Sequence, residues 1–505
     1  MGERPDLAAR LAETAARVPD RPALLWEGQE ISYRELDGRA DAVARGLQGF
    51  GVAPGDRVGI LLGNTPAFVA TFLGALRAGA TAVPLHTGVT SREAEHVLVD
   101  SGARVLVAGE AAEELVLAVR DRTPALEHVV LVDREGPDVV AWSAFTSTRE
   151  AAAVDRDPDD VAALVYTSGT TGRPRGAILT RRNLAANQDQ ALATPLAIEE
   201  GDVVLLALPL FHIYALNVGL GLAVRVGATL LLVERFDPVA ALDDVERHRV
   251  SVILGAPPMY VAWLETPGVA ERDLSHVRAA VSGAAALPGA VLERCERELG
   301  LTVWEGYGLT EASPAVASSA VGGAVKPGAV GRPLPGVELR VVDGGADVPQ
   351  GDPGEVWVRG ENVFRGYWND PEATAEVLTA DGWLRTGDIG ILDADGDLHL
   401  VDRTDDLVIV SGFNVYPREI EEVLHEHPDV AAAAVVGVSH PCSGEAVKAF
   451  VVPRVGTEIT AEDALRWCDG RLARFKQPTV VEVVEALPTT PTGKVRRGAL
   501  RGGTA

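Results

Sequence analysis

Cysteine is scarce in this sequence, with three residues in 505 (Cys295, Cys442 and Cys468). No two of them form a Cys-x-x-Cys pair, so neither a disulfide framework nor a zinc site is predicted, and a reducing cytoplasm is the expected location. A secretion signal is also missing, because residues 1–20 contain no apolar core segment and are typical of a short amphipathic helix.

Basic residues are outnumbered, since 46 Lys and Arg stand against 72 Asp and Glu and give a net charge of −26. This charge argues against a nucleic-acid backbone or an anionic membrane surface as the main partner. The most apolar long segment, residues 214–233, contains Asn217, Arg225 and several glycines, which favours a buried helix and strand over a membrane span. Peripheral membrane contact stays open.

Several common catalytic signatures are absent as well. The sequence has no Gly-x-Ser-x-Gly nucleophile elbow, and 425-HEH-427 lacks the spacing of a His-Glu-x-x-His zinc site. A Walker A loop is excluded after the strand-like run 161–165, because Pro174 stands five residues after Gly169, where a second glycine would be needed. An ordinary P-loop NTPase is therefore not predicted.

Short β-branched or leucine-rich runs alternate with helical patterns from residue 20 to about 260. That alternation is typical of parallel α/β layering, and capping boxes at 32–35 and 90–93 predict helix starts. Glycine and proline become dense over 326–400, which predicts a β-rich subdomain with tight turns. Past 403 the pattern turns to α+β, with strands near 431–438 and 447–452 and a helix near 460–475.

The predicted fold is therefore α/β. A large N-terminal domain of layered α/β subdomains plus the β-rich subdomain would span residues 1–402, and a small mobile α+β domain would span residues 403–505. The charged run 402–406 is the predicted linker.

The segment 166-YTSGTTGRPRG-176 has almost nothing to bury, although it follows an apolar run. Backbone N–H groups and hydroxyls of such a turn can close around phosphate oxygens, with a nearby cation to balance charge. The residues predicted to bind phosphate are Thr167, Ser168, Gly169, Thr170, Thr171, Gly172 and Arg175.

This loop resembles the phosphate-binding signature of the adenylate-forming superfamily, which includes acyl-CoA synthetases, luciferases and peptide-synthetase adenylation domains. Further segments resemble that family's signatures in the same order: 208–216, 282–288, 305–311, 382–390, 403–421 and 489–494. The sequence is most similar to bacterial fatty-acid-type CoA ligases. It departs from the family at Arg175, where lysine is usual, and arginine binds phosphate as a fork rather than as a point charge.

The resemblance implies a reaction in two steps. A carboxylate attacks the α-phosphate of ATP to give an acyl-adenylate and pyrophosphate, and the thiol of CoA then displaces AMP. ATP, Mg²⁺ and CoA are thereby implied. An acyl-AMP ligase that loads a carrier-protein thiol is the alternative. A nucleotide-binding regulator without catalysis is disfavoured because Thr310, Glu311, Asp388 and Lys494 are all present.

The resemblance also implies a nucleotide site. Tyr307 would lie on the adenine, opposite a wall formed by Gly283, Ala284 and Ala285, with Glu305, Gly306 and Gly308 completing the segment. Thr310 would contact the α-phosphate, and Glu311 and Thr170 would hold Mg²⁺. Asp388 would accept hydrogen bonds from the ribose hydroxyls, and Arg403 would assist at the same sugar or at a phosphate.

The C-terminal residues are implied to act at different stages. Lys494 would bridge the attacking carboxylate and the α-phosphate, and it is the catalytic residue of adenylation together with Thr310 and Glu311. Asp405 would be the hinge that brings the segment around Gly412 to the acyl-adenylate for thioester formation. Arg474 and Lys476 would meet phosphates of CoA.

Candidates for the acid pocket are mostly small or apolar: His212, Asn217, Pro257, Met259, Gly283 and Gly306. They predict a neutral hydrophobic substrate, with a medium- or long-chain fatty acid first and an aryl or polycyclic natural-product acid second. An amino-acid substrate is disfavoured because residues 210–214 include no acidic group to meet its ammonium. The oligomeric state stays open.

Overall fold

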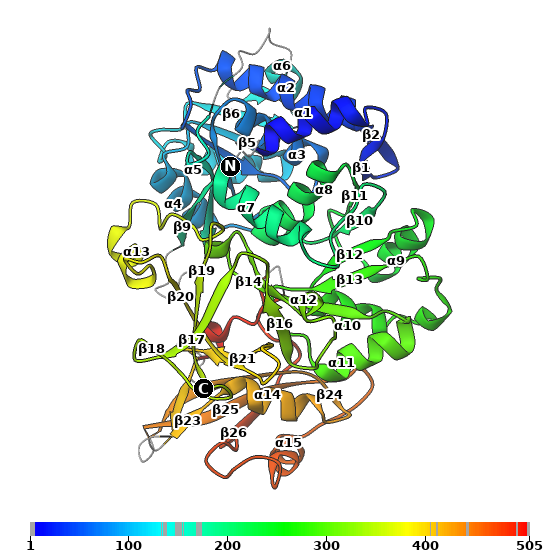
Figure 1. The fold of residues 1–505 in the computed structure, drawn as a ribbon, viewed down its shortest axis with the longest axis vertical. Helices are drawn as coiled ribbons and strands as arrows, with labels where there is room; N and C mark the ends of the chain where they lie inside the picture. The colour runs from blue at the N-terminus through cyan, green and yellow to red at the C-terminus, as the bar shows by residue number, and fades with distance from the viewer. Residues whose placement is uncertain are drawn as a thin grey trace.

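A computed structural model describes residues 6–132, 134, 139–146, 154, 156–167, 174–404, 406–410, 413–440, 444–490 and 493–501. These residues form a mixed α/β structure with a large N-terminal part and a small C-terminal part, drawn in orange and red in Figure 1. Their strands build sheets of seven, fourteen and five strands. The predicted fold class is confirmed.

The seven-stranded sheet is parallel except at its last pair, β8 with β9. In spatial order its strands are β7 (Val140–Ala141), β6 (His128–Val132), β5 (Val105–Gly109), β3 (Arg57–Leu61), β4 (Thr81–Pro84), β8 (Val161–Thr167) and β9 (Arg175–Thr180). Its helical segments are α2 (Tyr33–Gly49), α3 (Pro66–Arg77), α4 (Ser91–Ser101), η1 (Glu110–Ala112), α5 (Glu113–Arg120) and α6 (Trp142–Phe145). Capping boxes open α2 and α4, which confirms both predicted helix starts.

The fourteen-stranded sheet joins a half that is parallel except at its edge pair, β1 with β2, to an antiparallel half. The half next to the N-terminus is β2 (Gln29–Ser32), β1 (Pro22–Trp26), β11 (Thr229–Leu232), β10 (Val203–Leu206), β12 (Val252–Gly255), β13 (Ala279–Ser282) and β14 (Val303–Gly308). The order continues through β15 (Ala315–Ser318), β16 (Ala329–Pro333), β21 (Leu398–Arg403), β20 (Leu384–Leu392), β19 (Gly354–Arg359), β17 (Glu338–Asp343) and β18 (Ala346–Asp347). The predicted β-rich region therefore extends the α/β sheet.

Helical segments of several hydrogen-bonding types accompany this sheet. They are α1 (Leu7–Arg17), α7 (Arg181–Leu192), the π-helix Tyr214–Gly221, α8 (Leu222–Val226), α9 (Pro238–Arg247), α10 (Pro257–Leu264), η3 (Val269–Glu271), α11 (Gly289–Arg294), the π-helix Cys295–Leu299, η5 (Thr310–Ala312), α12 (Ser319–Gly322) and α13 (Pro371–Val377). The apolar segment 214–233 is a buried helix and strand, as predicted. None of the described helices is both long and apolar enough to cross a membrane.

The small C-terminal sheet has its own core. Its strands are β23 (Phe413–Val415), β22 (Val408–Val410), β25 (Gly444–Pro453) and β24 (Val430–His440), and β26 (Val480–Val483) pairs with β25. Helices α14 (Pro417–His425), α15 (Ala461–Cys468) and α16 (Arg497–Arg501) complete it. The helix predicted near 460–475 is shorter, since it ends at Cys468 and Gly470 follows with a left-handed φ of 73°.

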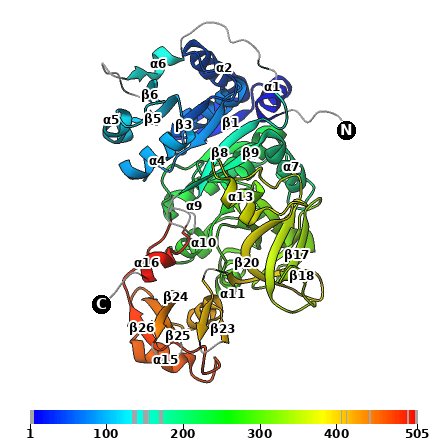
Figure 2. The ribbon, with the colours of Figure 1, turned by 90° about the vertical axis from the view of Figure 1, so that its left-hand side faces the viewer.

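The two parts of the chain meet at several places, and one of them is a turn of the C-terminal tail. Figure 2 shows α16 at the side of the large domain that carries α10. Gly493 packs so tightly on α10 that a Cβ there would lie 2.3 Å from Pro258 Cγ. On the other side of the interface, Arg418 of α14 donates to the Leu400 carbonyl at 2.6 Å. Cys295 and Cys468 are buried free thiols, and Cys442 lies outside the described residues.

Candidate active site

A cleft of about 2590 Å³ lies between the large and the small part of the chain. Its lining brings together residues that are hundreds of positions apart. The sequence-predicted residues among them are Thr167, Arg175, His212, Pro257, Gly283, Ala284, Ala285, Gly306, Tyr307, Gly308, Thr310, Glu311, Asp388, Arg403 and Lys494.

For other predicted site residues, no position relative to the cleft can be given. Ser168, Gly169, Thr170, Thr171, Gly172, Asp405 and Gly412 lie outside the described residues. Their predicted roles stay predictions.

Two neighbouring strand ends form one wall of the cleft. Ser282 of β13 and Glu305 of β14 are register partners in parallel strands, so the loop after β13 and the end of β14 meet at the same edge of the sheet. Ala284 in that loop has a left-handed φ of 68°. Gly308 lies so close to the next turn that a Cβ would be 2.3 Å from the Pro314 carbonyl oxygen, so any larger residue would displace this wall.

Tyr307 of β14, Asp388 of β20 and Arg403 of β21 form a connected group at the cleft. The Tyr307 hydroxyl donates to Asp388 Oδ2 at 2.5 Å, and Arg403 Nη1 lies 3.3 Å from Asp388 Oδ1. Burial, reinforced by the Asp388 charge, raises the pKa of Tyr307 well above its usual range, so the phenol stays a donor. The Asp388 carboxylate is thus fixed at the cleft by two side chains.

Glu305 differs from its predicted neighbours because it does not line the cleft. Its carboxyl is 3% exposed and accepts the Leu287 N–H at 3.2 Å, behind the loop that carries residues 283–285. Burial raises the pKa of Glu305 to about 7. The Glu305 carboxyl thus supports this wall of the cleft from behind, and the predicted contact of Glu305 with ATP stays a prediction.

Lys494 enters the cleft from a tight turn. The Gly493 N–H donates to the Thr490 carbonyl at 2.8 Å, and the Thr490 N–H donates to the Lys494 carbonyl at 2.7 Å. The side chain is open to the cleft but surrounded by protein, and this desolvation, together with the nearby Arg403 charge, lowers the pKa of the Lys494 ammonium. The turn thus presents a partly desolvated cation beside Asp388.

His212 faces Lys494 across the cleft. Its burial, with the charge of Lys494 added, lowers the pKa of the imidazole to about 4, so His212 is neutral at physiological pH. Its Nδ1 accepts the Tyr214 N–H at 3.3 Å. A neutral imidazole next to a cation can accept or donate a hydrogen bond without repelling a carboxylate.

Two residues predicted in the acid pocket do not line the cleft. The Asn217 side chain is 2% exposed, accepts from Gln188 at 2.8 Å and donates to the Ser313 carbonyl at 2.7 Å, so it serves the core. Met259 is 7% exposed and belongs to the hydrophobic core, whereas Pro257 and Pro258 of the same helix do line the cleft. The predicted contacts of Asn217 and Met259 with the acid stay predictions.

The residues predicted to meet CoA lie away from the cleft lining. Lys476 Nζ donates to both carboxylate oxygens of Glu419, at 2.8 and 2.7 Å, and Arg474 is exposed. Their roles toward CoA stay predictions.

Two contacts of the cleft were not predicted. Tyr367 donates its hydroxyl to Glu311 Oε1 at 2.8 Å, and Asp370 Oδ2 lies 3.3 Å from Arg175 Nε. Both come from 364-FRGYWND-370, whose aromatic pair between a glycine and the N-cap of α13 is the only local sign of a role. Their partners are far away in the sequence, which hides the relationship.

Comparison with known proteins gives two family matches. Residues 11–368 match the family described as AMP-binding enzyme, and residues 419–494 match the AMP-binding enzyme C-terminal domain.

Curated relatives resemble the chain over nearly its full length. A feruloyl-CoA synthase from Amycolatopsis sp is 40% identical over 494 residues, which cover 96% of this chain and 96% of that protein. A long-chain-fatty-acid–CoA ligase from Bacillus subtilis (strain 168) is 34% identical over 525 residues, which cover 98% of this chain and 94% of that protein.

A solved relative exists in two states. The crystal structure of ATP-bound MatB from Rhodopseudomonas palustris matches with a TM-score of 0.92 at 36% identity, covering 98% of each chain. The apo form of MatB matches with a TM-score of 0.81 at the same identity and coverage. The described arrangement is therefore more similar to the ATP-bound form.

Proposed function

Since the chain belongs to the AMP-binding enzymes and is an ATP-dependent acid–CoA ligase of the adenylate-forming superfamily, we propose that its acid has an uncharged, apolar body. The supporting observation is a groove of hydrophobic side chains in the cleft. Val281 Cγ1 lies 4.0 Å from where a Cβ on Gly306 would be, and Val281 pairs in register with Leu254. A second charged group would lose its hydration against these side chains.

Within this class we propose an aromatic acid first. The Gly283 backbone packs directly on the Tyr214 ring, since a Cβ added at Gly283 would lie only 2.9 Å from Tyr214 Cε1. Both residues line the cleft, so an aromatic ring is held at its wall. Aromatic rings pack favourably on such surfaces. The similarity to a feruloyl-CoA synthase supports the same choice. The order of the two sequence-based candidates is thereby reversed.

A fatty acid is the second candidate. The apolar residues Gly306, Val281 and Leu254 lie on the adjacent strands β14, β13 and β12. Two strand spacings correspond to about 10 Å of groove, which accommodates an alkyl chain as well as a ring. The Bacillus subtilis relative supports this candidate.

Acid-dependent ATP–pyrophosphate exchange tests the proposal, with a panel that contains aryl acids, straight-chain acids of increasing length and dicarboxylic acids. We expect aryl acids to give the highest kcat/KM and dicarboxylic acids the lowest. A preference for dicarboxylic acids would contradict the apolar pocket. Gly306→Val should raise KM for bulky acids more than for acetate, because its side chain would extend into the open space beside Gly306.

For the adenylation step we propose the following roles. Asp388, oriented by Tyr307 and Arg403, holds the ribose hydroxyls. The Lys494 ammonium contacts the attacking carboxylate oxygen and the α-phosphate oxygen, where negative charge accumulates as the new P–O bond forms. Both anions favour the charged form of Lys494, which offsets the desolvation that lowers its pKa in the free protein.

Mg²⁺ fits the donor set on this wall. The half-buried Glu311 carboxylate lines the cleft beside Thr310, and Mg²⁺ is commonly held by one or two carboxylates together with substrate phosphates. When bound, the ion would neutralise phosphate charge. Thr310 would contact the α-phosphate through its hydroxyl.

We further propose that the two domains divide near the predicted boundary 402/403, between the end of β21 and the start of β22, with the pivot at Asp405. β21 ends at Arg403 in the large sheet, and β22 begins at Val408 in the small one. The likeness to ATP-bound MatB supports assigning the described arrangement to adenylation. After rotation, Gly412, Arg474 and Lys476 would face CoA. Thioester formation with CoA tests this acceptor, and a product only with a carrier protein would favour the alternative.

A further inference from the structure

We propose that Tyr367 is a positioning residue for adenylation, which couples the cation of the phosphate loop, Arg175, to the carboxylate of Glu311. This inference rests on the proposed roles of those two residues. It concerns a side chain that stands outside every motif recognised in the sequence.

The backbone around Tyr367 is fixed against both partners. The Ile178 N–H donates to the Gly366 carbonyl at 2.9 Å, and the Trp368 N–H donates to the Gly176 carbonyl at 2.7 Å, so the segment lies along β9. At its other end the Phe364 N–H donates to the Glu311 carbonyl at 2.8 Å. One short segment therefore fixes the start of β9 relative to Glu311.

The side chain of Tyr367 repeats this connection. Its hydroxyl donates to Glu311 Oε1 at 2.8 Å, while the Arg175 guanidinium carbon lies 5.6 Å from the centre of its ring. Arg175 is held in place by Asp370, with 3.3 Å between Nε and Oδ2. Tyr367 thus contacts the Glu311 carboxylate through its hydroxyl and the Arg175 guanidinium through the face of its ring.

The chemistry of each contact explains what the coupling does. A carboxylate with one oxygen engaged by a tyrosine presents the other oxygen in a fixed direction, as partners behind a metal ligand do. A planar guanidinium can lie over an aromatic ring and pair with a carboxylate at the same time. The contacts with Tyr367 and Asp370 therefore give a physical reason for arginine at position 175.

The decisive experiment is a double-mutant cycle between Tyr367→Phe and Glu311→Gln. Tyr367→Phe keeps the ring that packs on Arg175 and edge-on against Phe364 at 5.0 Å, and it removes the hydroxyl alone. The readout is the Mg²⁺ concentration dependence of ATP binding to the full chain without acid, measured by calorimetry. Tyr33→Phe is the matched control, because it removes a buried hydroxyl bonded to the Ala223 and Ala228 carbonyls far from this site.

We expect Tyr367→Phe to raise the Mg²⁺ concentration needed for half-maximal ATP binding about tenfold. A change of this size is typical of the loss of a hydrogen bond to a charged acceptor. In the Glu311→Gln background, Tyr367→Phe should cause no further change in the Mg²⁺ dependence of ATP binding. The control Tyr33→Phe should show the same Mg²⁺ dependence as the wild type. Equal effects of Tyr367→Phe in both backgrounds, or none in the wild type, would overturn the coupling. If Glu311→Gln itself leaves the Mg²⁺ dependence unchanged, the proposed role of Glu311 fails and the coupling with it.

Arg175→Lys tests the other half. It should weaken ATP binding in the wild type and by less in a Tyr367→Leu background, where no ring is present. Equal weakening in both backgrounds would show that Arg175 acts without Tyr367.

Discussion

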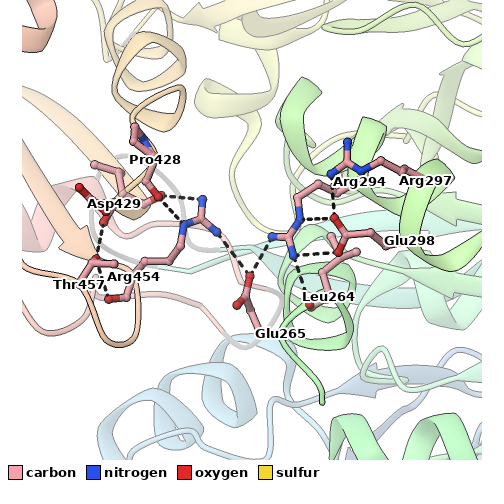
Figure 3. Close-up of polar contacts among 10 residues, drawn as sticks. Leu264, Glu265, Arg294, Arg297, Glu298, Pro428, Asp429, Arg454 and Thr457 are labelled. Atoms are coloured by element: carbon pink, nitrogen blue, oxygen red, sulfur yellow. Dashed lines mark hydrogen bonds and ion pairs between the residues drawn. The ribbon is translucent and has the colours of Figure 1, made fainter. Parts of the chain in front are cut away.

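Arg454 of the C-terminal sheet reaches Glu265 at the end of α10, with 3.4 Å between Nη1 and Oε1 (Figure 3). Glu265 is itself held by Arg294 at 2.9 Å. The remaining nitrogens of Arg454 donate to the carbonyls of Pro428 and Val430 at 2.9 and 3.1 Å. Both partners are thus fixed within their own part of the chain, and their contact joins the two parts far from the linker.

Arg454→Glu should slow adenylation, because it replaces this attraction with repulsion in the orientation that places Lys494 in the cleft. The side chains are 35% and 47% exposed, so the pair contributes little and we expect a loss of about twofold to fivefold. Thioester formation from supplied acyl-AMP should not fall. Arg359→Glu, which disrupts an exposed pair within the large sheet, is the control. An equal loss in both half-reactions would contradict a link specific to adenylation.

Lys494→Ala should reduce pyrophosphate exchange by about a hundredfold or more, since an electrostatic contact at the developing charge is removed. Thioester formation from supplied acyl-AMP should largely survive. Lys448→Ala, which removes a lysine paired with Glu482 on the small sheet, should leave exchange near the wild-type rate. Equal damage to both half-reactions by Lys494→Ala would refute the assigned role.

Gly493→Ala should impair adenylation because its Cβ would lie 2.3 Å from Pro258 Cγ and because φ at 493 is +82°. Pro258→Ala removes that ring carbon and should restore part of the lost exchange rate. The backbone strain would persist, so rescue should be incomplete. Absence of any rescue would mean that the close approach to α10 does not limit the position of Lys494.

Glu305→Gln should change how stability depends on pH. In the folded protein, burial raises the pKa of Glu305 to about 7 from a usual value of 4.5. A raised pKa means that its contribution to stability is complete below pH 4.5 and is lost as the pH rises to about 7, amounting to on the order of 3 kcal/mol. The variant should therefore lose less stability than the wild type between pH 5 and pH 8 in denaturant titrations. Parallel curves would contradict the burial of an ionisable carboxyl.

Much of the fold follows from local signals. The capping boxes at Ser32 and Thr90, and the buried run 214–233, are set by spacing within a few residues and were predicted correctly. The length of α15 was not, because a pattern of apolar residues does not reveal that the backbone turns at Gly470.

The candidate site could also be predicted only in part. Residues that lie together in the cleft could be placed through the family resemblance, whereas the direction of a side chain could not. Glu305, Gly306 and Tyr307 follow one another along β14. The Glu305 carboxyl supports the loop at Leu287, whereas Gly306 and Tyr307 line the cleft. Tyr367 contacts residues that are 56 and 192 positions away in the sequence, so only the folded chain reveals these contacts.

The ladder between β20 and β21 has a consequence for the intermediate. Asp388 and Arg403 are register partners near the end of this ladder, and the proposed pivot follows two residues later. The carboxylate assigned to the ribose therefore stays on the large sheet, on the stationary side of any rotation about 405. An acyl-adenylate formed here would stay bound at Asp388 while Lys494 moves out of the cleft and the residues proposed to face CoA move toward it. If the chain rotates about Asp405 as proposed, the position of Asp388 before this turn would keep the reactive mixed anhydride bound to the large domain between the two half-reactions.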